Sequence, residues 1–162
     1  MPYSYAAVPD HQRSGLCRAI LEALPAWFGI EAAREVYIAE VAELAMVAAY
    51  DGERPVGFAT LKPQTPAAAE LHLIGVLESH HRCGIGAQLL RRIEALARAQ
   101  GARFLTVKTL APSHADPGYA ATRAFYERQG FLPIEVFPLL WGKENPCLLM
   151  AKPLLWRAPG PG

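Results

Sequence analysis

The sequence predicts an α/β (α+β) fold, a single domain in which helices cover a mixed β-sheet. Its 162 residues suit one domain. Asp51-Gly52 separates two apolar runs, which is typical of a β-hairpin. Residues 69–76 alternate as a strand does, and an amphipathic helix follows them. A second strand pair near the C-terminus makes a mixed sheet more consistent with the pattern than a purely parallel one.

The first half of the chain is expected to contain two helices and three strands. One helical face is formed by Leu16, Ile20, Leu21 and Leu24, and Pro25 ends that helix. A second helix is expected over residues 31–44, where apolar residues recur at helical spacing. Strands are expected over residues 45–50, 55–61 and 69–76.

The second half begins with the clearest element, a helix that ends near Gly101. Its buried stripe comprises Leu89, Leu90, Ile93, Leu96 and Ala97, and its water-facing positions are Arg91, Arg92, Glu94 and Arg98. A strand over residues 103–108 and a helix over residues 120–129, closed by Gly130, are expected next. Residues 131–137 and 147–152 predict a final strand pair.

Composition excludes several classes of protein. The net charge of +1 gives no overall attraction to nucleic acid or to a membrane surface. Apolar runs are too short to span a bilayer, and the N-terminus lacks a signal-peptide pattern. Three cysteines (Cys17, Cys83 and Cys147) do not form a disulfide framework or a zinc motif, so we expect a cytoplasmic protein without a metal.

The segment between the strand at 69–76 and the following helix carries the strongest functional signal. Gly84 and Gly86 allow close approach of a ligand to the backbone. The unpaired N–H groups of a helix N-terminus begin directly behind them, which is a suitable arrangement for a diphosphate. A tight turn without a ligand would need the same two glycines. A P-loop does not fit, because Ala87-Gln88 stands where that motif needs Lys-Ser or Lys-Thr. A dinucleotide fingerprint does not fit either, because Leu89 stands where it needs a third Gly or Ala.

Two motifs here resemble the GNAT superfamily of acyl-CoA-dependent N-acyltransferases. Val76 ends a strand and His81-Arg-Cys-Gly-Ile-Gly86 opens a helix, while Arg123-Ala-Phe-Tyr-Glu-Arg-Gln-Gly-Phe131 resembles the late helix-to-strand junction of the family. The resemblance covers residues 45–154. It departs from the family at His81, where Arg or Gln is usual.

The resemblance implies a mostly antiparallel sheet of six to seven strands, covered by about four helices, with a splayed parallel strand pair that holds acyl-CoA. It implies an N-acetyltransferase domain over residues 1–156, followed by a flexible tail at 157–162. The implied co-substrate is acetyl-CoA, and the implied acceptor is a small-molecule or peptide amine. Two alternatives stay open, a non-catalytic acyl-CoA sensor and an acyltransferase for longer acyl chains. The implied oligomeric state is a monomer or a homodimer.

The resemblance also implies catalytic roles for two residues. Glu70 matches the catalytic Glu of the histone-acetyltransferase branch and is the candidate general base. A solvated Glu at a strand start is its alternative. Alternation places Glu70, His72 and Ile74 on one face, with Leu71, Leu73 and Gly75 on the other, so His72 is the reserve base. A histidine that is only hydrogen-bonded is its alternative. Tyr126 matches the family Tyr that protonates the leaving thiolate or positions its sulfur, and its alternative is a core aromatic.

The cofactor-binding residues implied by the resemblance lie at the end of the strand and in the loop after it. Backbone groups of the strand end are expected to bind the pantetheine arm, and the loop is expected to bind the diphosphate. A glycine within a strand, Gly75, suggests a bulge or a close ligand. The full set is Ile74, Gly75, Val76, His81, Arg82, Gly84, Ile85, Gly86 and Ala87.

The sequence leaves the acceptor amine open. Aromatic and polar residues of the early helices and of the loop at 141–147 are reasonable acceptor contacts, and ordinary packing is their alternative. They are Trp27, Phe28, Tyr37, Trp141, Glu144 and Asn145. The segment at 113–119 replaces a family Asn that contacts the cofactor, so its role is also open.

Overall fold

The computed structural model describes residues 2–154, which form seven strands and five α-helices. The strands are β1 (Ser4–Ala7), β2 (Ala45–Asp51), β3 (Arg54–Thr65), β4 (Ala68–Val76), β5 (Phe104–Leu110), β6 (Leu132–Phe137) and β7 (Cys147–Pro153). The helices are α1 (Asp10–Glu22), α2 (Pro25–Phe28), α3 (Glu31–Glu40), α4 (Ile85–Ala99) and α5 (Pro117–Arg128). Short 3₁₀ turns follow α3 and β4. The predicted tail at 157–162 lies outside the described residues.

The strands form one sheet in the order β1-β2-β3-β4-β5-β7-β6. Antiparallel ladders join β1 to β2, β2 to β3, β5 to β7 and β6 to β7. β4 and β5 are parallel, and their ladder pairs Ala68–Glu70 with Phe104–Thr106. The prediction of a mixed, mostly antiparallel sheet with one parallel pair is therefore confirmed, with one helix more than expected.

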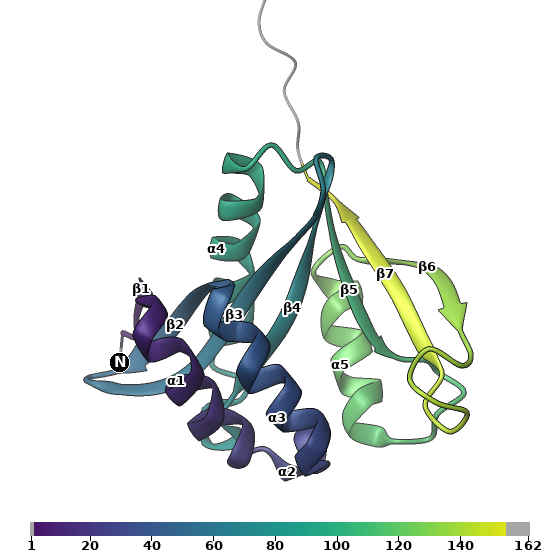
Figure 1. The fold of residues 1–162 in the computed structure, drawn as a ribbon, viewed down its shortest axis with the longest axis horizontal. Coiled ribbons are helices and arrows are strands. Elements are labelled where there is room, and N and C mark those ends of the chain that lie inside the picture. The colour runs from purple at the N-terminus through teal and green to yellow at the C-terminus, as the bar shows by residue number, and fades with distance from the viewer. Residues whose placement is uncertain (1, 155–162) are drawn as a thin grey trace, which may run out of the picture. The chain divides into compact units, whose positions relative to one another are not determined.

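The described chain divides into two compact units, and both β4 and α4 run through the boundary. The first unit contains residues 2–62 and 71–93. Its core lies between β2, β3 and the adjacent helices α1 and α3, which lie side by side in Figure 1. Ile20, Leu21, Met46 and Phe58 are fully buried there, as the predicted apolar face of the first helix requires.

The second unit contains residues 63–70 and 94–154. It is built on β5, β6 and β7, and α5 is joined to the end of β5 by Arg123, whose Nη1 donates to the carbonyl of Leu110 at 2.8 Å. Leu105, Val107 and Met150 are buried in this unit. Gly130 adopts φ +97° just after α5, which confirms that it closes the helix.

Three local expectations were wrong. The strand β1 was missed because its four residues are mostly exposed and show no apolar alternation. Helix α3 ends at Glu40 rather than Leu44, since Val41–Glu43 form a 3₁₀ turn. Glu94 does not face water, because it is buried and pairs with Lys152.

Simple alternation along β4 also fails, at Leu73. The backbone N–H of Leu73 donates to Thr60 Oγ1 at 3.1 Å, and its side chain joins the core cluster with α1 and α3. His72 contacts α3 as well, so two consecutive side chains lie toward the same helices. A local irregularity of the strand explains this, because a regular strand sends neighbours to opposite faces.

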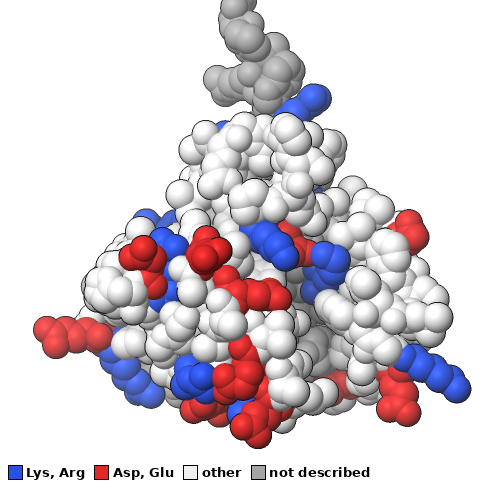
Figure 2. Space-filling view, viewed as in Figure 1, with Lys and Arg blue, Asp and Glu red and all other residues white. Residues whose placement is uncertain are grey.

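Charge on the face shown in Figure 2 is mixed, with acidic side chains gathered where α3 lies. This agrees with the acidic composition of residues 1–44, which contain six acidic and three basic residues. Within residues 2–154, none of the helices combines the length and the apolar character needed to cross a membrane.

Candidate active site

The loop from β4 to α4 has the geometry expected of an anion site. Arg82 and Gly84 adopt φ +62° and +78°, which turns the chain sharply before α4 begins at Ile85. A Cβ added at Gly84 would meet no atom within 4 Å, so the backbone there is open to a ligand. The first helical bond runs from the N–H of Gln88 to the carbonyl of Gly84 at 3.1 Å. The N–H groups of residues 85–87 precede it, and a helix makes no internal bond to such groups.

His81 is held against the end of β4. Its Nε2 lies 2.7 Å from the carbonyl oxygen of Val76, so this nitrogen carries a hydrogen and donates it. The indole of Trp27 meets the imidazole edge to face at 5.7 Å. At this position an imidazole ring, hydrogen-bonded to the last residue of β4, therefore stands where the family usually has Arg or Gln.

Close packing on α1 explains why a glycine stands at position 75. A Cβ added there would lie 3.3 Å from Ile20 Cγ2 and 3.4 Å from Leu24 Cδ1. The bulge or close ligand suggested by the sequence is not needed to explain this glycine. Close packing of β4 on the helix is sufficient.

Glu70 is buried and paired, which excludes the alternative of a solvated strand-start residue. It belongs to the second unit, where Lys108 Nζ of β5 donates to its Oε2. Cys147 of β7 lies close by. Burial raises the pKa of the Cys147 thiol, while the charge of Lys108 lowers it and that of Glu70 raises it. A carboxylate, an ammonium and a thiol thus share one neighbourhood on the sheet.

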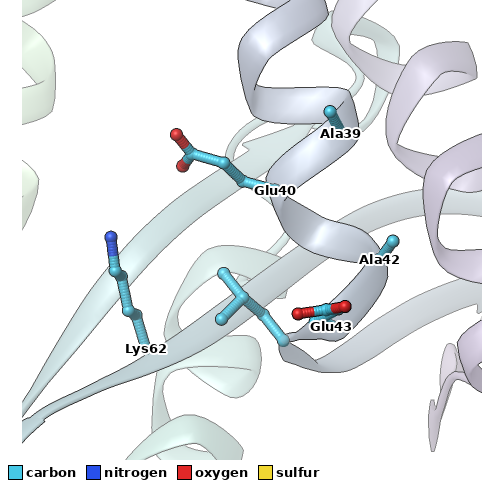
Figure 3. Close-up of a pocket in the computed structure, with 6 residues that line it drawn as sticks. Ala39, Glu40, Ala42, Glu43 and Lys62 are labelled. Atoms are coloured by element: carbon cyan, nitrogen blue, oxygen red, sulfur yellow. The ribbon is translucent and has the colours of Figure 1, made fainter.

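His72, the reserve base, has a different environment in the first unit. Its Nε2 lies 2.8 Å from Oε2 of Glu40, and the ring of Tyr37 meets it edge to face at 5.7 Å. Glu40 also lines a pocket of about 290 Å³ between the end of α3 and β3. Figure 3 shows the Glu40 and Lys62 side chains that border this pocket, together with Ala39, Ala42 and Glu43. The pocket includes none of the predicted cofactor residues.

Tyr126 lies in α5, buried between the rings of Phe125 and Phe131 at 5.6 and 5.5 Å. Burial raises its pKa well above the usual value of 10, and the nearby Tyr119 raises it further. The phenol therefore stays protonated at neutral pH and is a hydrogen-bond donor. Within the segment at 113–119, Asp116 Oδ1 caps α5 by accepting from Gly118 N at 2.8 Å and Tyr119 N at 3.3 Å, which gives this part of the segment a structural role.

Lys108 and Glu40 pair with the two candidate bases, Glu70 and His72, and were not singled out from the sequence. Lys108 stands in an otherwise apolar and threonine-rich strand, and a charge in such a strand was an available signal. The signal from Glu40 was weaker, because it resembles any polar residue near a helix end. Among the remaining expected acceptor contacts, Asn145 Nδ2 donates to the Trp141 carbonyl at 3.5 Å, within its own loop.

Comparison with known proteins agrees with the fold. Residues 25–131, more than half of the chain, match the acetyltransferase (GNAT) family model. A structure from Desulfovibrio desulfuricans assigned to the GNAT family is 21% identical, with a TM-score of 0.80 over 95% of this chain and 100% of that one. An aminoglycoside 6'-N-acetyltransferase complexed with coenzyme A is 22% identical, with a TM-score of 0.72 over 98% and 100%.

A third structure, the ribosomal-protein-S18-alanine N-acetyltransferase from Escherichia coli, is 17% identical, with a TM-score of 0.75 over 99% of both chains. These likenesses concern the fold, and the family model concerns the sequence. On the strength of the family match, the chain belongs to the acetyltransferase (GNAT) family.

Proposed function

We propose that this protein is an N-acetyltransferase that transfers an acetyl group from acetyl-CoA to a primary amine by direct attack in a ternary complex. The observation that carries the proposal is the β4–α4 loop, where Gly84 leaves open space directly before the N-terminus of α4. That space and the helix N–H groups fit a diphosphate, which coenzyme A contains. A GNAT-fold neighbour complexed with coenzyme A supports the same assignment.

The chemistry assigned to the chain is proton transfer. An amine of pKa about 10.4 is protonated at pH 7, and its deprotonation costs roughly 4–5 kcal/mol. Glu70 is the proposed general base that takes this proton as the amine nitrogen attacks the thioester carbonyl. Tyr126 is the proposed hydrogen-bond donor to the sulfur that leaves as the carbon–sulfur bond breaks. His72 remains the alternative base, and its test is the pH–rate profile of Glu70→Gln.

Thermal unfolding with separate ligands tests the cofactor assignment. Acetyl-CoA and CoA should each raise Tm, because a ligand at about a thousand times its Kd adds ~4 kcal/mol of stability. ATP and NAD are the controls and should cause no comparable shift. Absence of a shift with both CoA species would contradict the proposal.

A pair of glycine variants sharpens this test. Gly84→Val should abolish the CoA-induced shift, since the side chain enters the open space. Gly101→Val is the matched control, because Gly101 also has a positive φ, of +86°, and no atom within 4 Å of an added Cβ. Both variants carry similar backbone strain, so only a difference in cofactor binding distinguishes them. Equal CoA-induced shifts in the two variants would overturn the assignment of the loop.

Acceptor screening follows from the neighbours. Kanamycin, a peptide with N-terminal alanine and spermidine represent three amine classes, of which the first two correspond to acetyltransferases of the same fold. Turnover is measured as CoA release. Binding of acetyl-CoA without transfer to any amine would instead favour the sensor alternative.

A further inference from the structure

The pairing of Glu70 with Lys108 bears on how an acceptor amine enters. The register of β4 and β5 pairs Glu70 with Thr106, and Lys108 follows two residues later. Because side chains alternate along a strand, Thr106 and Lys108 share one face of β5. That face is the one toward which Glu70 points, and Lys108 Nζ donates there to Glu70 Oε2.

The two partners differ in their access to solvent. The Glu70 side chain is 9% exposed and that of Lys108 is 31% exposed. A carboxylate this buried needs a compensating cation, and Lys108 supplies it. The long, rotatable stem of lysine also lets its ammonium leave toward water without any movement of the backbone.

An acceptor amine would donate to the same carboxylate oxygen that accepts a hydrogen bond from Lys108, Glu70 Oε2. The amine arrives as an ammonium ion at neutral pH and must come within hydrogen-bond distance of the base that takes its proton. If Glu70 is that base, its Oε2 already accepts an N–H from an ammonium of the protein itself.

Resting on the proposed role of Glu70, we propose that the ammonium of Lys108 occupies the acceptor's position in the free enzyme and that an acceptor binds by displacing it. Lys108 is then a specificity-determining residue. Exchange of one ammonium for another gives little net electrostatic gain, so the acceptor must supply further contacts of its own. A bare amine such as propylamine should therefore be a poor acceptor.

Kinetics with propylamine test the displacement. Lys108→Met removes the competing cation and should lower the KM for propylamine about fivefold to tenfold. Lys108→Arg should raise this KM, since a guanidinium binds a carboxylate through two hydrogen bonds. The KM for acetyl-CoA should stay unchanged in both variants. An unchanged or higher KM for propylamine in Lys108→Met would overturn the proposal.

Lys152→Met is the matched control. Lys152 is the other lysine of the second unit that pairs with a buried glutamate, Glu94. Its replacement should leave the KM for propylamine within about twofold of the wild-type value. A purely structural role of Lys108 predicts that its Met and Arg variants both lose activity, instead of changing KM in opposite directions. Lys108→Gln, which keeps a donor to Glu70, replaces the Met variant if the latter does not fold.

A second readout does not depend on turnover. The sequence has four lysines (Lys62, Lys108, Lys143 and Lys152), so selective ¹⁵N,¹³C-lysine labelling gives a simple NMR spectrum in which Lys108→Met identifies the Lys108 signal. Propylammonium chloride added to the wild-type protein should shift the Lys108 signal saturably, whereas sodium chloride at equal ionic strength should not. The Lys152 signal should stay in place.

The outcomes of the two tests are separable. An unmoved Lys108 signal contradicts the displacement, provided that Glu70→Gln moves it and so shows that the signal reports the pair. Absence of any CoA-induced thermal shift contradicts the proposed function instead, and the NMR titration still decides whether an amine displaces Lys108.

Discussion

The second unit contains two lysine–glutamate pairs that are nearly identical as pairs and different in their surroundings. Glu70 and Glu94 have side chains that are 9% and 7% exposed, and their partners Lys108 and Lys152 are 31% and 23% exposed. The register of β5 with β7 pairs Lys108 with Leu149 and Lys152 with Leu105. The two lysines therefore lie on opposite faces of the same two-stranded ladder.

The surroundings suggest different roles for the pairs. Glu94 stands on α4 beside the buried Ile93, and the stem of Lys152 lies within 3.4–3.9 Å of where a Cβ of Gly130 would be. This pair is packed between a helix and a turn. Glu70 stands on β4, the strand that leads to the β4–α4 loop. Lys108 of β5 and the Cys147 thiol of β7 lie near it. Burial and pairing alone thus do not mark an active site, and the neighbouring groups must be considered as well.

The largest expected difference between the two pairs is the change in kcat when each glutamate is replaced by glutamine. Glu70→Gln should lower kcat about 100-fold at pH 7, because the proposed role of Glu70 is general-base catalysis, which contributes at least that factor. Glu94→Gln should leave kcat nearly unchanged. Steady-state CoA release checks both variants, and a thermal shift with CoA shows that cofactor binding survives. Equal losses of kcat in the two variants would contradict the proposed difference in function between the two pairs.

Replacing each lysine should, in contrast, lower the stability of the protein by a similar amount. Lys108→Met and Lys152→Met each remove the lysine that pairs with a buried carboxylate, and each should lower the free energy of unfolding by about 3 kcal/mol. Urea denaturation followed by circular dichroism measures this. A loss confined to Lys152→Met would mean that the Lys108 pair contributes no stability and that water replaces its cation.

Tyr126→Phe should have a smaller effect on turnover than Glu70→Gln, about 30-fold or less, because protonation of a thiol of pKa near 8.5 gains only about 2 kcal/mol. Tyr119→Phe, on the same helix, is the control and should retain wild-type turnover. A larger loss in Tyr126→Phe than in Glu70→Gln would reverse the ranking of acid and base.

An exposed ion pair gives the smallest expected effect and completes the comparison. Arg18 binds Glu35 through two hydrogen bonds of 2.6 and 2.7 Å between α1 and α3. The hydrogen bond from Arg18 is the main cause that holds the pKa of Glu35 below its usual value of 4.5. Such a carboxylate stabilises the fold above its unfolded-state pKa, and this contribution disappears as the pH falls through the lower folded-state pKa.

Glu35→Gln should therefore lower Tm slightly at pH 7, by less than Lys152→Met does, since solvent screens an exposed pair. The difference from the wild type should vanish at pH values below the folded-state pKa of Glu35. Thermal unfolding at several pH values measures it. A difference that persists in acid would show that the carboxylate charge is not its source.

Much of the fold follows from local sequence signals. The stripe of Leu89, Leu90 and Ile93 predicted α4 because helical periodicity is visible within one segment, and all three are buried. Gly101 and Gly130 both adopt the positive φ that a helix-ending glycine requires. β1 was invisible for the opposite reason, since a short exposed edge strand has no apolar period to detect.

Errors within the elements arose where a long-range contact outweighed the local pattern. Glu94 occupies a position that periodicity assigns to solvent, yet Lys152 reaches it from a strand 58 residues later in the chain. Leu73 departs from alternation where its side chain joins the core cluster of the first unit and its backbone N–H donates to the hydroxyl of Thr60 on the neighbouring strand. Neither partner could be identified from its own segment.

The sequence by itself determined the strand-loop-helix unit around Gly84, because glycine positions, a strand end and an amphipathic helix are all encoded within about twenty consecutive residues. Only the tertiary structure decided the partners of its charged groups. Glu70 meets Lys108 because of the register between two parallel strands, and His72 meets Glu40 because α3 packs near β4. Register and packing depend on residues far apart in the chain, and they decide which charges compensate one another.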